Sequence, residues 1–377
     1  MLGSLSGALG RFSVTRQVKI GSLLLGGGNP ILVQSMTNVP TNEAKKVLRQ
    51  IKALANLGCD FVRVTVPDKA AVEALPEILE KSPLPVVADI HFDYRLALAS
   101  IKAGVKKLRL NPGNIGSAER VQKVAEAAGL AGIPIRIGIN AGSLRADVKK
   151  EVLARKISLG HAMAKHALKE AALLEKFGFS DIVLSVKSSD VLETVAAYRF
   201  LHQNCDYPLH LGITEAGGLE DALLKSGAGL GALLLEGIGD TLRISITGPI
   251  AKEAVAGRKL LQFLKLRPYG PEVISCPTCG RTRVNLAKMA ALVEKALKGN
   301  KELKNYPCKV AVMGCAVNGP GEAASADAGL AGGVGYFLLF SQGKVLGRVK
   351  ESEALARLLS VLRDQKKSFE KIKKIKK

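Results

Sequence analysis

Short β-branched runs recur over the first two-thirds of this chain, separated by stretches rich in Ala, Leu and Lys. This alternation is typical of βα units, in which a helix joins each strand to the next parallel strand. Eight such runs predict an α/β fold, the TIM (β/α)8 barrel. An open doubly wound sheet is the alternative, but no G-x-G-x-x-G motif follows the first run. The runs are Ile31–Met36, Phe61–Val66, Pro85–Ile90, Lys107–Asn111, Pro134–Asn140, Asp181–Lys187, Pro208–Ile213 and Thr241–Ile246.

Side chains alternate between the two faces of a strand, and in these runs the alternation separates an apolar face from a polar one. In the second run, Val62 and Val64 lie on the apolar face, which leaves Arg63 pointing toward the barrel axis. The same division in the other runs predicts a polar barrel interior. Its members are Arg63, Thr65, Asp89, His91, Arg109, Asn111, Arg136, Asn140, Ser185, Lys187, His210, Thr214, Arg243 and Ser245.

The predicted interior carries an excess of positive charge. A TIM barrel ordinarily fills its axis with Val, Ile and Leu, and a buried cation without a partner costs several kcal/mol. Two carboxylates, Asp89 and Glu215, are too few to neutralise the inward cations. Guanidinium groups bind phosphate oxygens through paired hydrogen bonds, so the interior predicts a site for an anion of diphosphate size. The five cations are Arg63, Arg109, Arg136, Lys187 and Arg243.

The overall charge also indicates an anionic partner, since 55 Lys and Arg against 33 Asp and Glu give a net charge of +22. Aromatic residues make up only 4% of the chain and Trp is absent, which disfavours the stacking platforms of proteins that bind single-stranded nucleic acid. No apolar run is long enough to cross a membrane. Because the chain also starts without a recognisable secretion signal, we expect a cytoplasmic protein with reduced thiols.

A second domain follows the barrel. The βα rhythm stops near Leu266, and Arg267–Pro271 has the composition of a linker. We predict a barrel domain over residues 1–266, a smaller α+β domain over 267–365 and a solvated basic tail over 366–377. The elements expected in the smaller domain are a helix over Val284–Lys298, a strand over Lys309–Met313, a hairpin over Tyr336–Val349 and a helix over Ser352–Leu362.

This second domain carries a metal signature. Cys276 and Cys279 form a C-x-x-C motif, and Cys308 and Cys315 follow it. A structural zinc site would use all four thiolates, whereas a [4Fe-4S] cluster could use Cys276, Cys279 and Cys315 with a non-cysteine ligand. The spacing alone does not distinguish the two. The isolated cysteines, which we expect to fill the core, are Cys59 and Cys205.

Eight longer motifs follow one another along the chain. They are Val33–Asn38, Val62–Val64, Ala88–Arg95, Leu108–Ile115, Pro134–Ser143, His210–Gly218, Glu236–Arg243 and Gly314–Ala323. In sequence and order they resemble the motifs of the 4-hydroxy-3-methylbut-2-enyl diphosphate synthase family of the non-mevalonate isoprenoid pathway. The resemblance covers nearly the whole chain, apart from the first dozen residues and the basic tail.

The resemblance implies an iron-sulfur oxidoreductase of the two-domain bacterial form. Its reaction would be the reductive ring opening and dehydration of 2-C-methyl-D-erythritol 2,4-cyclodiphosphate to (E)-4-hydroxy-3-methylbut-2-enyl diphosphate. Electrons would come from flavodoxin or ferredoxin, and the protein would form a homodimer in which each cluster domain caps the partner's barrel. The implied ligands of the [4Fe-4S] cluster are Cys276, Cys279, Cys315 and Glu322.

The resemblance also implies roles for the inward residues. Glu215 becomes the candidate proton donor, and Asp89 and His91 would assist in positioning or proton transfer. The residues that would bind the diphosphate are Arg63, Arg109, Asn111, Arg136, Asn140, Lys187, Arg243 and Ser245.

Two other functions compete with this hypothesis. The first is a redox-free TIM-barrel enzyme acting on a phosphate ester, with a structural zinc domain attached, which predicts zinc and no need for a reductant. The second is a zinc-ribbon protein that binds nucleic acid, which predicts binding with a steep salt dependence. The second leaves the inward arginines unexplained.

Overall fold

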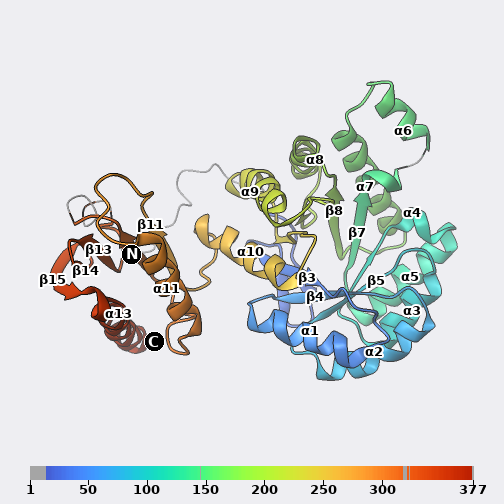
Figure 1. Cartoon of the computed structure of the whole chain (residues 1–377). Coiled ribbons are helices and arrows are strands. Elements are labelled where there is room, and N and C mark those ends of the chain that lie inside the picture. The colour runs from blue at the N-terminus through green and yellow to red at the C-terminus, as the bar shows by residue number, and fades with distance from the viewer. Residues whose placement is uncertain (1–13, 145, 317–320, 322, 376–377) are drawn as a thin grey trace. The chain divides into compact units, whose positions relative to one another are not determined.

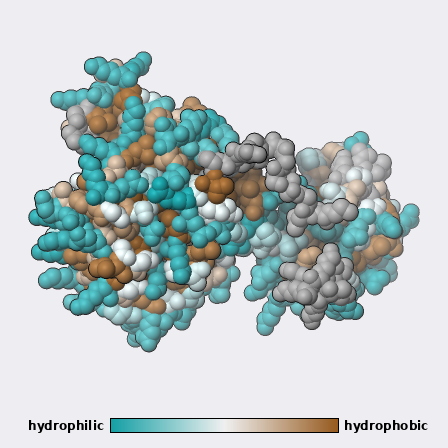
Figure 2. Space-filling model, turned by 180° about the vertical axis from the view of Figure 1, so that it is seen from behind, coloured by the Kyte–Doolittle hydropathy of each residue, from teal (hydrophilic) through white to brown (hydrophobic). Residues whose placement is uncertain are grey.

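The computed structural model describes residues 14–144, 146–316, 321 and 323–375. The chain divides between Arg267 and Pro268 into two compact units, which are described separately. Figure 2 shows mainly hydrophilic side chains over the face of the first unit that it presents, with apolar residues scattered among them. In the part of the chain that the structure describes, no helix is both long and apolar enough to span a membrane.

The first unit contains eight parallel strands, one in each predicted run. They are β3 (Leu32–Met36), β4 (Phe61–Thr65), β5 (Val86–Asp89), β6 (Lys107–Leu110), β7 (Ile135–Asn140), β8 (Ile182–Lys187), β9 (His210–Leu211) and β10 (Thr241–Leu242). Their order in the sheet is β8-β7-β6-β5-β4-β3-β10-β9. A parallel bridge between Leu184 and Leu209 joins the two ends of this order. The strands therefore close into a barrel, and the predicted TIM fold is confirmed.

The helices of the first unit lie around the outside of the barrel (Figure 1). They bury the apolar outer face of the strands, including Val62, Val64, Ile135 and Ile137, in one continuous core. These helices are α1 (Ala44–Asn56), α2 (Lys69–Lys81), α3 (Tyr94–Ala103), α4 (Pro112–Ile115), α5 (Ala118–Ala131), α6 (Ala146–Leu153), α7 (Leu159–Lys176), α8 (Val191–Asn204), α9 (Leu219–Leu235) and α10 (Ile250–Phe263).

The last two strands are shorter than predicted, at two residues each. We expected the eighth run to remain a strand as far as Ile246, but the N–H of Ile246 donates to the carboxylate of Glu253 at 3.2 Å. This backbone group therefore bonds to a helix side chain in place of a neighbouring strand.

A short antiparallel hairpin, which the sequence did not predict, consists of β1 (Val18–Ile20) and β2 (Leu23–Leu25). Ile20 and Leu25 of this hairpin pack with Phe61 and Val183, which lie at the starts of β4 and β8. The hairpin thus covers the N-terminal end of the barrel with apolar side chains. The opposite end, where the strands finish, is the end at which TIM-barrel active sites form.

In its described residues, the second unit is a five-stranded mixed sheet with two long helices, and the predicted α+β architecture is confirmed. Its strands follow the chain order in the sheet, with the first three parallel and the last two antiparallel. These elements are β11 (Glu272–Ser275), α11 (Leu286–Gly299), β12 (Lys309–Met313), β13 (Ala328–Gly333), β14 (Tyr336–Ser341), β15 (Lys344–Lys350) and α13 (Glu351–Ile375).

Two features of this unit differ from the prediction. The Gly-rich strand β13 was not predicted, because glycine disfavours strands. A Cβ at Gly329 would lie 2.3 Å from Cζ of Phe340, so glycine is needed where that ring crosses the strand. In addition, α13 continues to Ile375, well past the predicted end at Leu362. Gln365 ties this extension to the sheet, since its Nε2 donates to the backbone oxygen of Asp327 at 2.7 Å.

The contact between α7 and α8 provides a test of the packing. A Cβ at Gly160 of α7 would lie 2.3 Å from the backbone oxygen of Glu193. We expect Gly160→Ala to lower the free energy of unfolding by about 1–3 kcal/mol, because the two helices must move apart. Gly227 of α9 is exposed with open space around it, so Gly227→Ala should leave stability unchanged or raise it by up to ~1 kcal/mol. Urea denaturation followed by circular dichroism measures both, and equal effects would contradict this packing.

Candidate functional site

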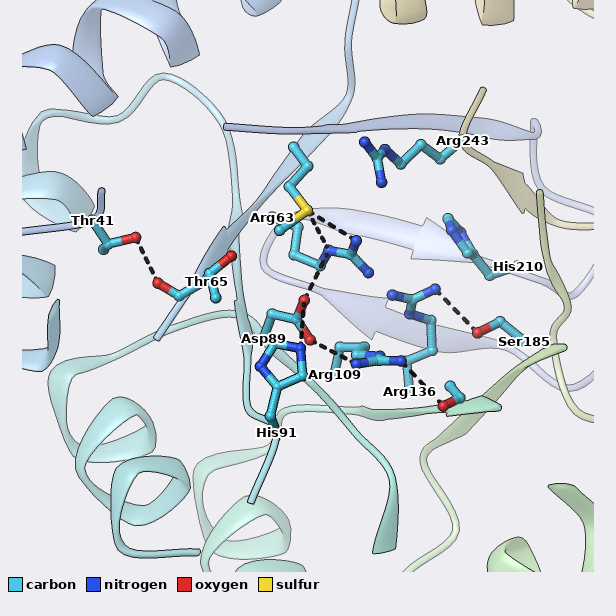
Figure 3. Close-up of polar contacts among 12 residues, drawn as sticks. Thr41, Arg63, Thr65, Asp89, His91, Arg109, Arg136, Ser185, His210 and Arg243 are labelled. Atoms are coloured by element: carbon cyan, nitrogen blue, oxygen red, sulfur yellow. Dashed lines mark hydrogen bonds and ion pairs between the residues drawn. The ribbon is translucent and has the colours of Figure 1, made fainter. Parts of the chain in front are cut away.

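The upper part of the barrel interior is organised around Asp89, which is 3% exposed. Its Oδ1 lies 3.1 Å from Nη1 of Arg109 and its Oδ2 lies 3.5 Å from Nε of Arg63. Figure 3 shows the three side chains converging, with His91 beside them. Burial alone would raise the pKa of Asp89, but the charges of Arg63 and Arg109 outweigh burial and lower it. Asp89 is therefore a carboxylate that holds two arginines in place.

Arg243 has a different carboxylate partner. Its Nη2 lies 2.9 Å from Oε1 of Glu253, and its Nε donates to Oε2 at 3.2 Å. Glu253 lies on α10, is 3% exposed and also accepts a hydrogen bond from the hydroxyl of Ser35 at 3.0 Å. Glu253 was not predicted as a site residue, because an acid in the first turn of a helix is ordinarily explained by the helix dipole. Glu253 is thus the carboxylate that forms the ion pair with Arg243.

The other two predicted cations, Arg136 and Lys187, are buried and have no carboxylate partner among the described residues. Nη1 of Arg136 donates to Oγ of Ser185 at 3.1 Å, and Nζ of Lys187 lies 3.4 Å from Nε2 of His210. Burial first, and then the charge of Arg136, lowers the pKa of Lys187 well below its ordinary value. The structure therefore supports the predicted excess of positive charge, which is concentrated on these two residues.

The remaining predicted residues lie near the ends of the strands. Asn111 is buried and its Oδ1 accepts from the N–H of Gly113 at 3.2 Å, whereas Asn140 is exposed and Ser245 is half-buried. Glu215 is exposed and has φ of +51°, in the left-handed region that non-glycine residues rarely adopt. Such strained residues cluster at functional sites. His91 is partly exposed, with Nε2 3.9 Å from Oδ2 of Asp89.

Two glycines, which the sequence analysis did not single out, make room for these cations. A Cβ at Gly138 would lie 2.5 Å from Nε of Arg109, and a Cβ at Gly212 would lie 2.4 Å from Nζ of Lys187. Any larger residue at either position would displace a charged group. The interior therefore accommodates long cationic side chains only because neighbouring strands carry no side chain there.

The second unit brings its cysteines toward one edge of its sheet. Cys276 follows β11 and Cys315 follows β12, and these strands are parallel neighbours with Ser275 opposite Val312. The N–H of Gly314 donates to Sγ of Cys276 at 3.3 Å, which is the type of bond that stabilises a thiolate ligand. Cys279 is exposed in the adjoining loop. The fourth predicted ligand, Glu322, lies outside the described residues.

These three cysteines supply the thiolate donors that a [4Fe-4S] cluster takes. Each ligand of such a cluster binds a different iron atom, so the ligands need not converge on one point. Within the described residues, no three His, Cys, Asp or Glu side chains are grouped to hold a single metal ion. Cys308 is instead a buried core thiol whose pKa burial raises to about 12, and Cys59 is likewise buried.

Comparison with known proteins matches both units. The family described as GcpE TIM-barrel domain matches residues 15–258, and the GcpE protein C-terminal domain matches residues 272–364. The chain belongs to the GcpE family. The sequence resemblance is thereby confirmed, and neither competing function predicts a match that spans both units.

Relatives of this GcpE chain are similar over nearly their whole length. A protein of Caldanaerobacter subterraneus subsp. tengcongensis is 52% identical over 92% of this chain and 96% of the relative. A protein of Clostridium acetobutylicum is 50% identical over 92% of this chain and 97% of the relative. One of Desulfotalea psychrophila is 46% identical over 95% of this chain and 97% of the relative. All three are named 4-hydroxy-3-methylbut-2-en-1-yl diphosphate synthase (flavodoxin).

Lys187 provides a test of the uncompensated charge in this GcpE barrel. We expect Lys187→Met to raise the melting temperature of the anion-free protein by ~2 °C or more, because a buried charge without a counter-ion is removed. The same variant should bind inorganic pyrophosphate at least ~10-fold more weakly. The control is Lys165→Met at an exposed position of α7, which should change neither property.

The gain in stability should also depend on pH. Because folding lowers the pKa of Lys187, its protonated form weakens the fold most at pH values below the lowered pKa. The difference in melting temperature between Lys187→Met and the unsubstituted protein should shrink as the pH rises toward 10.5, the ordinary lysine value. A gain that is constant or grows with pH would show that Lys187 is not a strained cation.

Proposed function

We propose that this chain reduces 2-C-methyl-D-erythritol 2,4-cyclodiphosphate to (E)-4-hydroxy-3-methylbut-2-enyl diphosphate. Counted as free acids, the reaction takes up two electrons and two protons, opens the ring and releases one water. The observation that carries this proposal is the pair of buried cations, Arg136 and Lys187, at the centre of a GcpE barrel. A diphosphate supplies the counter-charge that the described residues do not.

The barrel is organised to bind a diphosphate with little rearrangement. Asp89 holds Arg63 and Arg109, and Glu253 holds Arg243, so three guanidinium groups keep their directions before any ligand binds. Such preorganisation reduces the entropy lost on binding. Arg136 and Lys187 would gain a counter-ion, which raises their lowered pKa values and keeps them charged. Asn111, Asn140 and Ser245 would add hydrogen bonds at the mouth.

Glu215 is our candidate for the proton donor to the leaving hydroxyl. It lies beyond β9 at the open end of the barrel, and its strained backbone fixes its direction. Asp89 is held as a carboxylate by two arginines, so we assign it a positioning role, shared with His91 through their 3.9 Å contact.

Glu215→Gln tests this role. We expect kcat to fall by about 10²-fold or more with little change in KM, because the amide cannot transfer a proton and still fills the same space. The control is Glu220→Gln at an exposed position in the first turn of α9, which should keep full activity. If Glu215→Gln has activity close to that of the unsubstituted enzyme, another group donates the proton to the leaving hydroxyl.

The cofactor proposed for the second unit is a [4Fe-4S] cluster. Cys276, Cys279 and Cys315 would hold it, and Glu322 would be the fourth ligand on the basis of the family resemblance. When bound, the cluster supplies electrons one at a time. The relatives' names support flavodoxin as the electron donor, and the net charge of +22 favours docking of an acidic carrier. Ferredoxin is the other candidate, and we place the protein in the cytoplasm.

Metal analysis of protein purified without oxygen tests the cluster. We expect about four irons per chain and a broad absorbance near ~400 nm that bleaches on reduction. Cys315→Ser should lose most of the iron, whereas Cys308→Ser should keep it because Cys308 is a buried core thiol. Turnover of the cyclodiphosphate with a chemical reductant is the parallel assay. Colourless protein with about one zinc per chain would contradict the proposed function.

We also propose a homodimer in which the cluster unit of each protomer serves the partner's barrel. Complementation tests this arrangement, with Lys187→Met as the barrel-defective variant and Cys315→Ser as the cluster-defective one. After subunit exchange, the mixture should recover activity that neither variant has alone, because one barrel and one cluster unit of each heterodimer are intact. If subunit exchange is proven and the mixture has no activity, the barrel must instead act with the cluster unit of its own chain.

A further inference from the structure

A second polar group extends deeper into the barrel than the Asp89 cluster, by which we mean Asp89, Arg63 and Arg109. It consists of five inward side chains that are each at most 2% exposed, and we call it the lower cluster. Four of these residues have no role in the proposed reaction, and the fifth, Arg136, also belongs to the diphosphate site. The lower cluster contains Gln34, Lys107, Arg136, His210 and Thr241.

The strand register places Lys107 below the Asp89 cluster, whereas Arg136 lies opposite Arg109 and adjoins both groups. Lys107 and Arg109 lie on the same face of β6, with Lys107 nearer the start of the strand. Thr241 is opposite His210 in neighbouring parallel strands. Inward residues of a TIM barrel stack in layers along the axis, so Lys107, His210 and Thr241, which begin their strands, lie nearer the N-terminal end. The floor beneath it is apolar, since Nζ of Lys107 lies 5.6 Å from the ring centre of Phe61.

The lower cluster contains several hydrogen-bonding atoms that the protein does not satisfy. Within the described residues, seven of its buried atoms have no hydrogen-bond partner, although buried polar atoms of native proteins nearly always have one. They come from strands on different sides of the barrel. These atoms are Nε2 and Oε1 of Gln34, Nζ of Lys107, Nε and Nη2 of Arg136, Nδ1 of His210 and Oγ1 of Thr241.

The charges and hydrogen-bond donors of these atoms favour the binding of an anion. Lys107 and Arg136 are cations, and most of the unsatisfied atoms are hydrogen-bond donors. The nearby carboxylates are already engaged, Asp89 with two arginines and Glu253 with Arg243. A metal cation would be repelled, and water alone would leave two buried charges without a counter-ion.

We propose that the lower cluster binds one small inorganic anion of halide size beneath the diphosphate site. A spherical ion accepts hydrogen bonds from any direction, which suits donors on separate strands. The floor formed with the β1–β2 hairpin is apolar, so it offers these donors no acceptor of its own. The anion offsets the repulsion between Lys107 and Arg136, and it leaves Arg136 charged for the ligand above. This inference does not rest on the reaction proposed for the enzyme.

The electrostatics agree with this assignment. Burial first, and then the charge of Arg136, lowers the pKa of Lys107 well below its ordinary value. Burial and the charges of Arg136, Lys187 and Lys107 lower the pKa of His210 in the same way. A bound anion opposes each of these charge effects.

Thermal unfolding in different sodium salts tests the proposal. The full-length protein is saturated with inorganic pyrophosphate to occupy the upper site, and chloride or bromide is compared with gluconate at equal ionic strength. We expect halide to raise the melting temperature by at least ~2 °C. Lys107→Met should abolish this difference, because it removes the main cation of the lower cluster. Lys106→Met changes the exposed neighbour and should keep the full halide effect.

Crystals grown with bromide provide a second measurement that needs no variant. We expect an anomalous peak inside the barrel within hydrogen-bonding distance of Lys107 and His210. The proposal is overturned if the unsubstituted protein shows no halide effect, if Lys107→Met keeps the effect, or if bromide binds only outside the lower cluster. In that case, ordered water molecules would satisfy the buried polar atoms in place of an anion, and Lys107 would be uncharged. None of these outcomes bears on turnover of the cyclodiphosphate, so the two proposals fail separately.

Discussion

The burial of several positive charges along one barrel axis is the constraint on which the rest of this structure depends. Asp89 and Glu253 offset three of the five predicted cations, and Arg136 and Lys187 have no carboxylate partner among the described residues. Such an interior opposes folding, because charges leave water without full compensation. The apolar contacts that stabilise the barrel therefore lie on the outer face of the strands. There Val62, Ile135 and their neighbours pack beneath the helices.

The same constraint explains features that would otherwise be unrelated. Gly138 and Gly212 lack side chains at the points where Arg109 and Lys187 need space. The N-terminal hairpin covers the end of the barrel that carries no predicted binding residue. The residues proposed to bind the ligand lie at the opposite, open end of the barrel. In the function that we propose, a phosphorylated ligand would complete the charge balance that folding leaves unfinished.

In the second unit, strand pairing brings together cysteines that are distant in sequence. Cys276 and Cys315 are far apart in sequence, but each follows one of two parallel strands that are neighbours in the sheet. Parallel strands end at the same edge, so the pairing of β11 with β12 positions both thiols. The N–H of Gly314, which donates to Cys276, shows that the backbone already points a donor at this sulfur.

The barrel, the α+β unit and most of the candidate site could be predicted from the order of residues in the chain. Strand alternation is a local property, so the order of residues within each run is enough to place Arg63, Asp89 and Arg109 on the inward face. The same rule puts Lys107 on that face, but a lysine at the start of a strand is equally typical of a solvated strand end, so its burial gives no local signal. Long motifs identify the family, because their residues follow one another in the chain.

Which residues become partners could be learned only from the folded chain. The pairing of Arg243 with Glu253, the space that Gly138 leaves for Arg109, and the packing of Phe340 over Gly329 all join residues whose chemistry gives no local signal. The extension of α13 to Ile375 likewise depends on Gln365 reaching the sheet. Periodicity reports the face on which a side chain lies, whereas charge compensation and close packing depend on distances across the fold, which appear only when the chain is folded.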